Sequence, residues 1–346
     1  MVDGKTTEIL EFVRVHSLLS SKAIHDGLAS QISYATVKRV LTRLVIEKLV
    51  VAVGQGRGRK YEIGPAYQLL YPVNPAQYFE KEIDEREIKP GFNFTLITEV
   101  LHQVDLFTVT ELQELTGLQQ KFETKVSELS RAEYGKEYER FAIDLSWKSS
   151  QIEGNTYSLL ETELLLKEKV TAAGKTNAEA MMLLNHKVAL DFVLENPGYI
   201  SPLSISSIED IHSMLVKDLD VDRNIRKRRV GISGTNYKPL DNEFQIKEAL
   251  GDMCELINSK ASVFEKALLV LVLIAYIQAF GDGNKRTARI ISNAILMGNE
   301  YCPISYRTID SVEYKKAMLI FYEQNNISLF KKIFVDQFEF AVNTYF

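Results

Sequence analysis

The segment 278–289 constrains this chain more than any other, because it places a glycine-rich loop between an apolar run and a basic one. It consists of Gln-Ala-Phe-Gly-Asp-Gly-Asn-Lys-Arg-Thr-Ala-Arg. The glycines let the backbone turn and bring N–H groups close to a ligand, and the start of the following helix adds positive potential. Asp282 offers a hard oxygen for Mg2+, while Arg286 and Arg289 share one helix face. These parts in this order predict a site for a polyphosphate nucleotide bound with a metal ion.

The same segment resembles the signature of the Fic (Fic/Doc) family. That signature is His, any residue, Phe, any residue, Asp or Glu, Gly, Asn, Gly or Lys, Arg, two residues and Arg. The matching positions are Phe280, Asp282, Gly283, Asn284, Lys285, Arg286 and Arg289. The first position departs, because Gln278 stands where the family has His. The resemblance implies a helical Fic core that uses ATP and Mg2+ to transfer AMP to a Ser, Thr or Tyr hydroxyl of a protein substrate.

The resemblance also assigns roles to individual residues. The catalytic positions are Gln278, Asn284 and Arg286, and Asp282 is the metal ligand. The nucleotide contacts are Gly281, Asp282, Gly283, Asn284, Lys285, Arg286, Arg289 and, by analogy, Tyr314 in a helix downstream of the signature. For Tyr314, packing in the core is an equally good expectation.

Gln278 leaves the chemistry without its usual base. An amide donates and accepts hydrogen bonds but takes up no proton near pH 7, and loss of a general base costs about 10²–10⁴ in rate. Three explanations stay open: an introduced His-to-Gln change, a natural pseudoenzyme that still binds nucleotide, or a different group serving as base. We therefore expect transfer by this chain to be weak or absent.

Lys285 raises a second question. Most adenylylating members of the family have Gly at this position, whereas Doc, a toxin kinase of the same fold, has Lys and transfers the γ-phosphate. Lys285 thus keeps protein phosphorylation open as an alternative to AMP transfer. A surface lysine that contacts no donor nucleotide is a further possibility.

A second motif, Ser149-Ser-Gln-Ile-Glu-Gly-Asn155, resembles the inhibitory motif of the family. Ser149 and Glu153 share a helix face, and Gly154 is suited to end that helix. The resemblance implies that Glu153 forms a salt bridge with Arg289 and holds it away from the terminal phosphate of the nucleotide. The alternative is that Glu153 is simply a carboxylate at a helix end.

The N-terminal part resembles a winged helix-turn-helix. Its pattern predicts helices over 5–15, about 21–29 and about 34–48, followed by strands over 49–53 and 60–63 that are joined by a glycine-rich turn. Side chains suited to DNA contact are Lys38, Arg39 and Arg43 on the third helix and Arg57 and Arg59 in the turn. A module that only dimerises or contacts a protein partner remains an alternative, and a homodimer stays open.

After a connector flanked by Pro72 and Pro90, the pattern predicts a mostly α-helical chain. The expected helices cover about 109–117, 120–152, 159–170, 177–195, 205–218, 244–259, 262–279, 285–298, 311–324 and 328–343. The segment 230–239 interrupts them and predicts a small β-hairpin, which in the family is a flap that holds the target protein. Val230, Ile232 and Tyr237 are its candidate contacts, and the basic run 226–229 just before it is expected to be a solvated face.

We therefore expect three parts: a winged-helix domain over 1–70, a connector with the inhibitory helix over 71–155, and a Fic core over 156–346. Residues 1–62 hold ten Lys or Arg and six Asp or Glu, a charge of +4 within a chain of net charge −5. This basic part on an acidic body is consistent with DNA as a partner. The longest apolar run is too short to span a bilayer. With no signal-peptide pattern and two unpatterned cysteines, a cytoplasmic location is expected. A DNA-binding regulator with a nucleotide-sensing, non-catalytic Fic core is the main alternative function.

Overall fold

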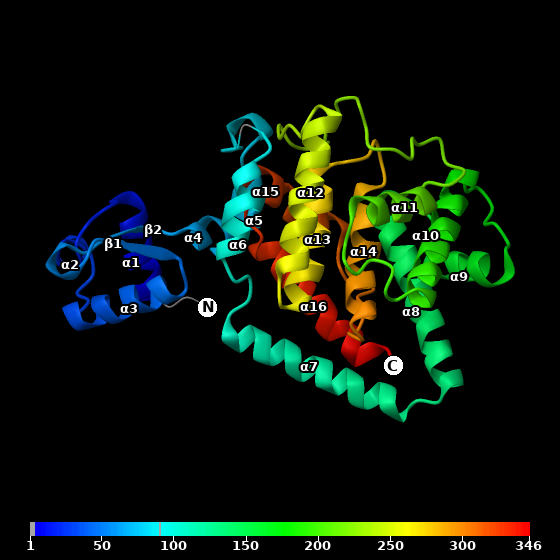
Figure 1. Cartoon of the computed structure of the whole chain (residues 1–346), viewed down its shortest axis with the longest axis horizontal. Helices are drawn as coiled ribbons and strands as arrows, with labels where there is room; N and C mark the ends of the chain where they lie inside the picture. The colour runs from blue at the N-terminus through cyan, green and yellow to red at the C-terminus, as the bar shows by residue number, and fades with distance from the viewer. Residues whose placement is uncertain (1–3, 90) are drawn as a thin grey trace.

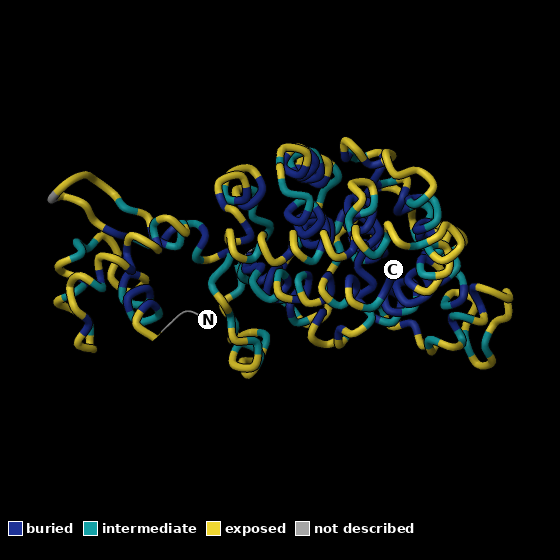
Figure 2. Tube along the Cα trace, turned by 90° about the horizontal axis from the view of Figure 1, so that it is seen from below, coloured by how far each residue is buried: buried dark blue, intermediate teal, exposed yellow. Residues whose placement is uncertain are grey.

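The two largest hydrophobic clusters divide the chain into a small N-terminal lobe and a large helical body (Figure 1), and a third, small cluster lies around Tyr157 and Leu183 in the body. The computed structural model describes residues 4–89 and 91–346. Figure 2 shows buried residues gathered inside each lobe, with a thin neck between the two. Among the described residues, no helix combines the length and apolar character needed to cross a bilayer.

The N-terminal lobe has the winged-helix order of elements. These are α1 (Gly4–Val15), α2 (Ser21–Gly27), α3 (Tyr34–Ile46), β1 (Val50–Val53) and β2 (Lys60–Ile63), with a short 3-10 turn, η1 (Gly56–Gly58), between the strands. The hydroxyls of Ser20 and Ser33 cap α2 and α3 by accepting from Ala23 N and Thr36 N, because unpaired N–H groups at a helix start favour such side chains. The strands pair antiparallel with Val50 opposite Ile63. The predicted winged helix is confirmed.

The neck is held against the body by buried side chains, Ala66 and Leu69, and by hydrogen bonds to its main chain. It comprises α4 (Pro65–Leu70), α5 (Pro75–Phe79) and the 3-10 turn η2 (Ile83–Glu85). The Asn326 amide of the body donates to the carbonyl oxygens of Gln68 and Tyr71, each at 2.8 Å. Ile327 N donates to Leu69 O, also at 2.8 Å. The winged helix also contacts the body directly, because Lys48 Nζ donates to Gln103 O and pairs with Asp105 at 3.2 Å.

The body is built almost wholly of helices. In chain order they are η3, a π-helical turn (Leu96–Val100), α6 (Leu101–Gln103), α7 (Val109–Glu128), α8 (Arg131–Ile152), α9 (Leu159–Glu168), α10 (Asn177–Glu195), α11 (Ile205–Leu215), α12 (Glu243–Ser259), α13 (Val263–Ile277), α14 (Asn284–Gly298), α15 (Ser311–Gln324) and α16 (Ser328–Thr344). The predicted mostly α-helical class is confirmed. One boundary differs, because the break between α7 and α8 lies at Leu129–Ser130 rather than near 118–119. There Ser130 and Glu133 form a capping box, the signal S-x-x-E that marks a helix start.

Helix α13 occupies the centre of the body (Figure 1). Nearly all of its residues are buried, including every one from Ala267 to Ile277, as expected for a helix that is apolar on all sides. Its closest companion is α14, which packs along it after the loop at 278–283. This central pair places the start of α14 deep in the body and fixes the site described next.

Candidate nucleotide site

The loop between α13 and α14 turns through two left-handed residues. Gln278 ends α13 with φ 53° and ψ 54°, and Gly283 begins α14 with φ 82°. A Cβ on Gly283 would lie 3.3 Å from the ring of His212 as well as in a strained conformation. Glycine is therefore needed at 283 for both backbone angle and space.

Asn284 closes this loop with its side chain. Its Oδ1 accepts from Phe280 N at 2.9 Å, and its Nδ2 donates to Phe280 O at 2.8 Å and to Gln278 Oε1 at 3.1 Å. The sequence led us to expect this side chain on a phosphate, but its polar atoms are engaged within the loop. The side chain of Asn284 therefore holds the loop in its conformation. Its backbone N–H belongs to the first turn of α14.

His212 on α11 supports the same loop and was not singled out from the sequence. Its ring stacks on Phe280 with 3.6 Å between ring centroids, and its Nε2 lies 2.9 Å from Asp282 O. Nδ1 lies 3.2 Å from Arg223 O. Burial lowers the pKa of His212, although both carbonyl oxygens favour its protonated form. The available signal was its position on the inner face of an amphipathic helix, which also fits ordinary core packing.

Arg286 is a buried cation with spare hydrogen-bond donors. Its side chain is 1% exposed, and Nη2 donates to Asp282 Oδ2 at 2.9 Å. Its Nε and Nη1 are buried and have no partner among the described residues. A buried guanidinium with unmet donors is costly, and planar guanidinium groups match phosphate oxygens well. This arrangement fits an anion at the start of α14.

Arg289, one turn further along α14, contacts both predicted inhibitory residues. Its Nε donates to Ser149 Oγ at 2.8 Å, and its Nη2 donates to Ser149 O and to Glu153 Oε1, both at 2.9 Å. Tyr314, for which a nucleotide contact and core packing were both expected, is fully buried and lies against Arg289. The guanidinium carbon lies 5.3 Å from the centre of that ring, so Tyr314 supports the arginine in this structure.

Glu153 lies between two cations of α14. Besides Arg289, it accepts from Lys285 Nζ at 2.6 Å through its other oxygen, Oε2. Burial by itself would raise the pKa of the carboxyl, but Arg289 and Lys285 lower it to about 2. Gly154 follows with φ 100°, a conformation that suits glycine where α8 ends. The family resemblance predicted the contact with Arg289, whereas the contact with Lys285 was not anticipated.

Gln278 and Arg226 hold the C-terminal end of α13. Gln278 Nε2 donates to Ala275 O at 2.6 Å. Arg226 is 5% exposed, and its Nε and Nη2 donate to Gln278 O and Leu240 O, both at 2.5 Å. A cation at a helix C-terminus is favourable because the carbonyl end of the helix carries partial negative charge. The expected solvated face at 226–229 is therefore wrong for Arg226, although Lys227, Arg228 and Arg229 are exposed.

The predicted hairpin at 230–239 is not formed. Among the described residues the only sheet is the pair β1–β2, and 230–239 is an extended segment with a turn at Ser233–Gly234. Its groups bond elsewhere, since Tyr237 is buried with its hydroxyl donating to Tyr276 O at 3.1 Å, and Gly234 O accepts from Arg86 at 3.1 Å. Val230 and Ile232, the other expected flap contacts, are half-buried.

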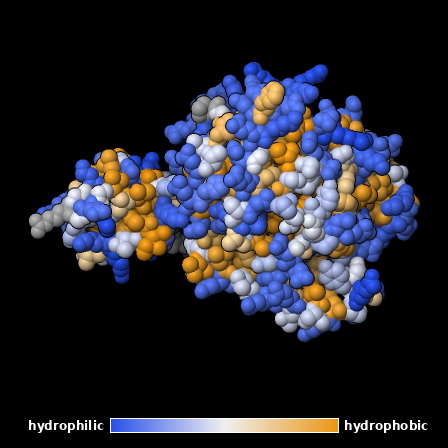
Figure 3. Space-filling view, viewed as in Figure 1, coloured by the Kyte–Doolittle hydropathy of each residue, from blue (hydrophilic) through white to orange (hydrophobic). Residues whose placement is uncertain are grey.

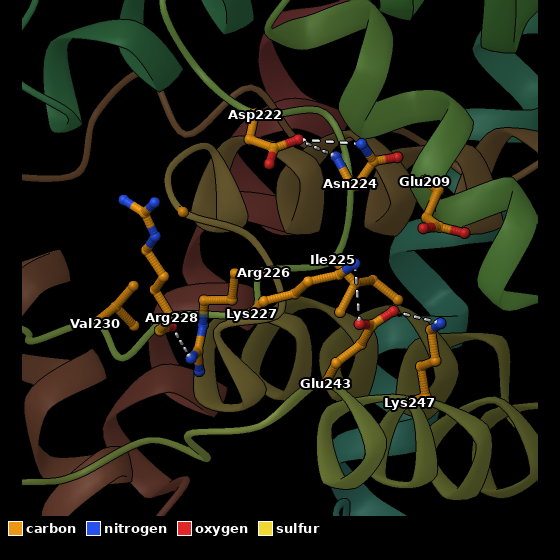
Figure 4. A pocket seen from close by; sticks show the side chains of 11 residues that line it. Glu209, Asp222, Asn224, Ile225, Arg226, Lys227, Arg228, Val230, Glu243 and Lys247 are labelled. Atoms are coloured by element: carbon orange, nitrogen blue, oxygen red, sulfur yellow. Dashed lines mark hydrogen bonds and ion pairs between the residues drawn. The ribbon is translucent and has the colours of Figure 1, made fainter.

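A polar cavity of about 830 Å³ opens beside the loop at Gly281 (Figure 4). It lies between α11, the segment 222–230 and α12. Its lining carries charges of both signs, from Glu209, Asp222, Arg226, Lys227, Arg228, Glu243 and Lys247. Glu243 is paired with Lys247 at 2.7 Å and with Lys227 at 3.6 Å, whereas Glu209 has no ion pair among the described residues. Gly281 is the residue of the loop that lines this cavity.

The predicted DNA contacts lie on the outer surface of the N-terminal lobe. The side chains that the structure describes are exposed: Lys38, Arg39, Arg43 and Arg59. Arg43 is turned back towards the lobe, with Nη2 2.5 Å from Thr6 Oγ1 and Nε 3.8 Å from Glu47. The side chain of Arg57 lies outside the described part. Figure 3 shows hydrophilic and apolar side chains side by side on this lobe.

Asp282 is the carboxylate of the loop that could serve as a ligand for a metal ion. Among the described residues, no three His, Cys, Asp or Glu side chains gather into a metal site. Asp282 remains 64% exposed while it accepts from Arg286. Mg2+ is often held by one or two carboxylates together with substrate phosphates and waters. Asp282 therefore fits a Mg2+ ion that arrives with a nucleotide.

Two family models match this chain. The Fic/DOC family matches residues 202–296, and the penicillinase repressor family matches residues 5–65. The chain is 27% identical over 175 residues to protein adenylyltransferase fic-1 of Caenorhabditis elegans, covering 48% of this chain and 34% of the relative. It is 29% identical over 174 residues to protein adenylyltransferase Fic of Nematostella vectensis, covering 49% and 40%. The chain thus spans only about a third of the length of the first of these relatives.

Solved structures show the same fold. Fic-1 (residues 134–508) from C. elegans superposes with a TM-score of 0.59 at 22% identity, covering 68% of this chain and 70% of that one. A Fic domain containing signaling protein from Bacteroides thetaiotaomicron superposes with a TM-score of 0.55 at 19% identity, covering 66% and 95%. At these identities the likeness establishes the arrangement of the helices.

Proposed function

Because this chain is a Fic/DOC family protein with an N-terminal penicillinase repressor (winged-helix) domain, we propose that its body binds ATP and adenylylates a protein hydroxyl. The observation that carries the proposal is Arg286, a buried guanidinium with two N–H groups that no described residue accepts. It stands at the start of α14 beside a glycine-rich loop, where the helix N-terminus adds positive potential. The phosphates of ATP would satisfy these donors.

The remaining loop residues have roles that follow from their positions. Gly281, Gly283 and the backbone of Asn284 and Lys285 present the start of α14 to the phosphates, and Asp282 would hold Mg2+. Bound Mg2+ would neutralise charge on the leaving pyrophosphate. Asn284 keeps the loop in this conformation through its three hydrogen bonds.

The acceptor protein is proposed to approach along 227–232. None of the backbone N–H groups of 227–236 donates to another backbone group among the described residues. An extended segment with free N–H groups can pair with an added strand. The cavity at Gly281 lies beside this segment (Figure 4) and would admit side chains that flank the acceptor hydroxyl.

We propose that the structure is the inhibited form. Arg289 is held by Ser149 and Glu153, so it is not free to bind a terminal phosphate. Gln278 further limits the reaction, because its amide takes no proton from the acceptor hydroxyl. Both features predict little transfer by the chain as it stands.

The test uses the Glu153→Gly and Gln278→His double variant with ATP labelled at the α- or the γ-phosphate. Self-modification that carries the α-label supports AMP transfer, whereas the γ-label alone would replace it with protein phosphorylation. Calorimetry of Glu153→Gly with ATP and Mg2+ accompanies the labelling. Absence of binding in that measurement would overturn the proposal.

We propose DNA binding as a second function, favoured by the exposed basic side chains of α3 and of Arg59 after the turn between β1 and β2. In a winged helix the third helix enters the major groove and phosphate contacts come from the flanking elements. The proposal predicts binding to DNA fragments that weakens steeply as salt is raised. Binding that is absent at low salt would refute it and leave the lobe as a protein-contact module.

A further inference from the structure

Glu153 is held through both carboxylate oxygens by cations from one face of α14. Arg289 Nη2 lies 2.9 Å from Oε1, and Lys285 Nζ lies 2.6 Å from Oε2. Arg289 also donates twice to Ser149, whereas Glu153 is the only hydrogen-bond or ion-pair partner of the Lys285 side chain within the described residues. The ammonium therefore depends on Glu153 for its position, while the guanidinium does not.

We propose that Lys285 is a positioning residue with two partners in turn: it holds Glu153 in the closed site and contacts a nucleotide phosphate once Glu153 withdraws. This inference rests on the proposed ATP site and adds the regulation of that site. It also assigns a role to a lysine that the sequence left open between phosphotransfer and no function.

The first role of Lys285, holding Glu153 in the inhibited site, follows from the position of Glu153. Glu153 is the C-terminal cap of α8, and the carbonyl end of a helix is unfavourable for a carboxylate. Attraction by nearby cations must therefore exceed repulsion by the partial negative charge at the end of α8 if Glu153 is to stay ionised there. Arg289 reaches only Oε1, so Lys285 is what satisfies Oε2 and fixes the rotation of the carboxylate.

The second role of Lys285, contact with a phosphate after Glu153 withdraws, follows from its neighbours. It lies in the first turn of α14, directly before Arg286 with its two buried, unpartnered N–H groups. Its side chain is 25% exposed, and a lysine has a flexible stem with three donors. Without Glu153, the only ion pair left to Lys285, Arg286 and Arg289 among the described residues is that of Arg286 with Asp282, and this excess of positive charge favours an anion. The ammonium can then exchange a carboxylate for a phosphate without any movement of α14.

These two roles oppose each other, so the effect of removing Lys285 depends on Glu153. In the Glu153→Gly background, Lys285→Met removes only the phosphate contact. We expect about a tenfold weaker affinity for ATP with Mg2+, the size of a hydrogen bond between charged groups. With Glu153 present, Lys285→Met also loosens Glu153. We then expect the ATP affinity to fall by less than about threefold, or to rise, because loss of the phosphate contact and release of Glu153 offset each other.

Calorimetry with ATP and Mg2+ on the wild type, both single variants and the double variant measures this dependence. Lys285→Arg in the Glu153→Gly background keeps the charge and should restore most of the affinity. Lys136→Met, at an exposed lysine of α8, is the matched control and should leave every affinity unchanged. Thermal unfolding of each variant establishes that it is folded.

The outcomes separate the two proposals. An equal loss of affinity from Lys285→Met with and without Glu153 would overturn the exchange of partners, and so would no loss in the Glu153→Gly background. If Glu153→Gly itself binds no ATP with Mg2+, the nucleotide site fails, and the role of Lys285 fails with it. If Glu153→Gly binds ATP but Lys285→Met changes the ATP affinity by the same factor with and without Glu153, only the role of Lys285 is refuted.

Discussion

Replacing Glu153 by Gln should destabilise the free protein and at the same time make ATP a stronger stabiliser. The substitution keeps the shape of the side chain but removes the charge between Lys285 and Arg289. The fall of the Glu153 pKa from an ordinary 4.5 to about 2 corresponds to about 3 kcal/mol of stability at neutral pH. Loss of one partner from a buried ion pair costs a similar amount, about 3–5 kcal/mol.

The expected signal is a lower melting temperature without ligand. For a helical body of this size, each kcal/mol shifts Tm by about 2 °C, so Glu153→Gln should lower Tm by roughly 6 °C at pH 7. Saturating ATP with Mg2+ should then raise Tm more in the variant than in the wild type. The gain is larger in the variant because a phosphate takes the place of the missing carboxylate. At a ligand concentration one hundred times Kd, binding adds about 2.7 kcal/mol to the free energy of unfolding.

The pH dependence has a definite sign. Since the pKa of Glu153 is lowered by folding, its stabilisation is fully present above the ordinary value of 4.5 and is lost as pH falls towards about 2. The difference in unfolding free energy between wild type and Glu153→Gln should therefore be constant from neutral pH to about 5 and shrink below 4.5. Urea unfolding at several pH values measures it.

Glu163→Gln is the matched control. Glu163 also pairs with a lysine at a short distance, 2.8 Å from Lys167, but the two side chains are 44% and 42% exposed. Such a surface pair contributes about 0.3–0.5 kcal/mol, so Tm should move by about 1 °C or less. Equal effects of the two substitutions, or an ATP response in Glu153→Gln no larger than that of the wild type, would refute the reasoning.

Three further outcomes are expected. Gln278→His, made together with Glu153→Gly, should raise the rate of AMP transfer by about 10²–10⁴ by restoring a general base; labelled self-modification measures the rate, and an unchanged rate would argue for another base. Asn284→Ala should lower the free energy of unfolding by about 2 kcal/mol and weaken ATP binding, because the loop loses three hydrogen bonds; denaturant titration and calorimetry check this, and intact ATP affinity would contradict it. Arg39→Ala should weaken DNA binding and reduce the slope of log K against log salt by about 1; a gel-shift series in salt tests it, and an unchanged slope would exclude a phosphate contact.

The parts of the fold and of the site that the sequence predicted are those encoded over a few neighbouring residues. The glycine-rich loop, the start of α14 and the capped helix α3 each follow from a local pattern of glycine, serine and apolar positions. The pairing of Arg289 with Glu153 was predicted by family resemblance alone, since the two residues are 136 positions apart.

The contacts that escaped prediction depend on packing between distant elements. Lys285 meets Glu153 across 132 positions, and nothing in a helix pattern tells which partner a long side chain will reach. Arg226 belongs to a run of four basic residues, yet only it turns inward, because the end of α13 lies next to it. The hairpin at 230–239 failed since alternation and glycines indicate extended chain, while its hydrogen-bond partners lie elsewhere.

The amide of Asn326 has a consequence for how this protein can change. It recognises the neck by the carbonyl oxygens of Gln68 and Tyr71, which any amino acid would supply at those positions. Substitutions at the exposed basic positions Lys38 and Arg39 of α3 therefore leave these two hydrogen bonds intact. If the lobe binds DNA as proposed, its sequence preference can change while the same hydrogen bonds hold it beside the helical body.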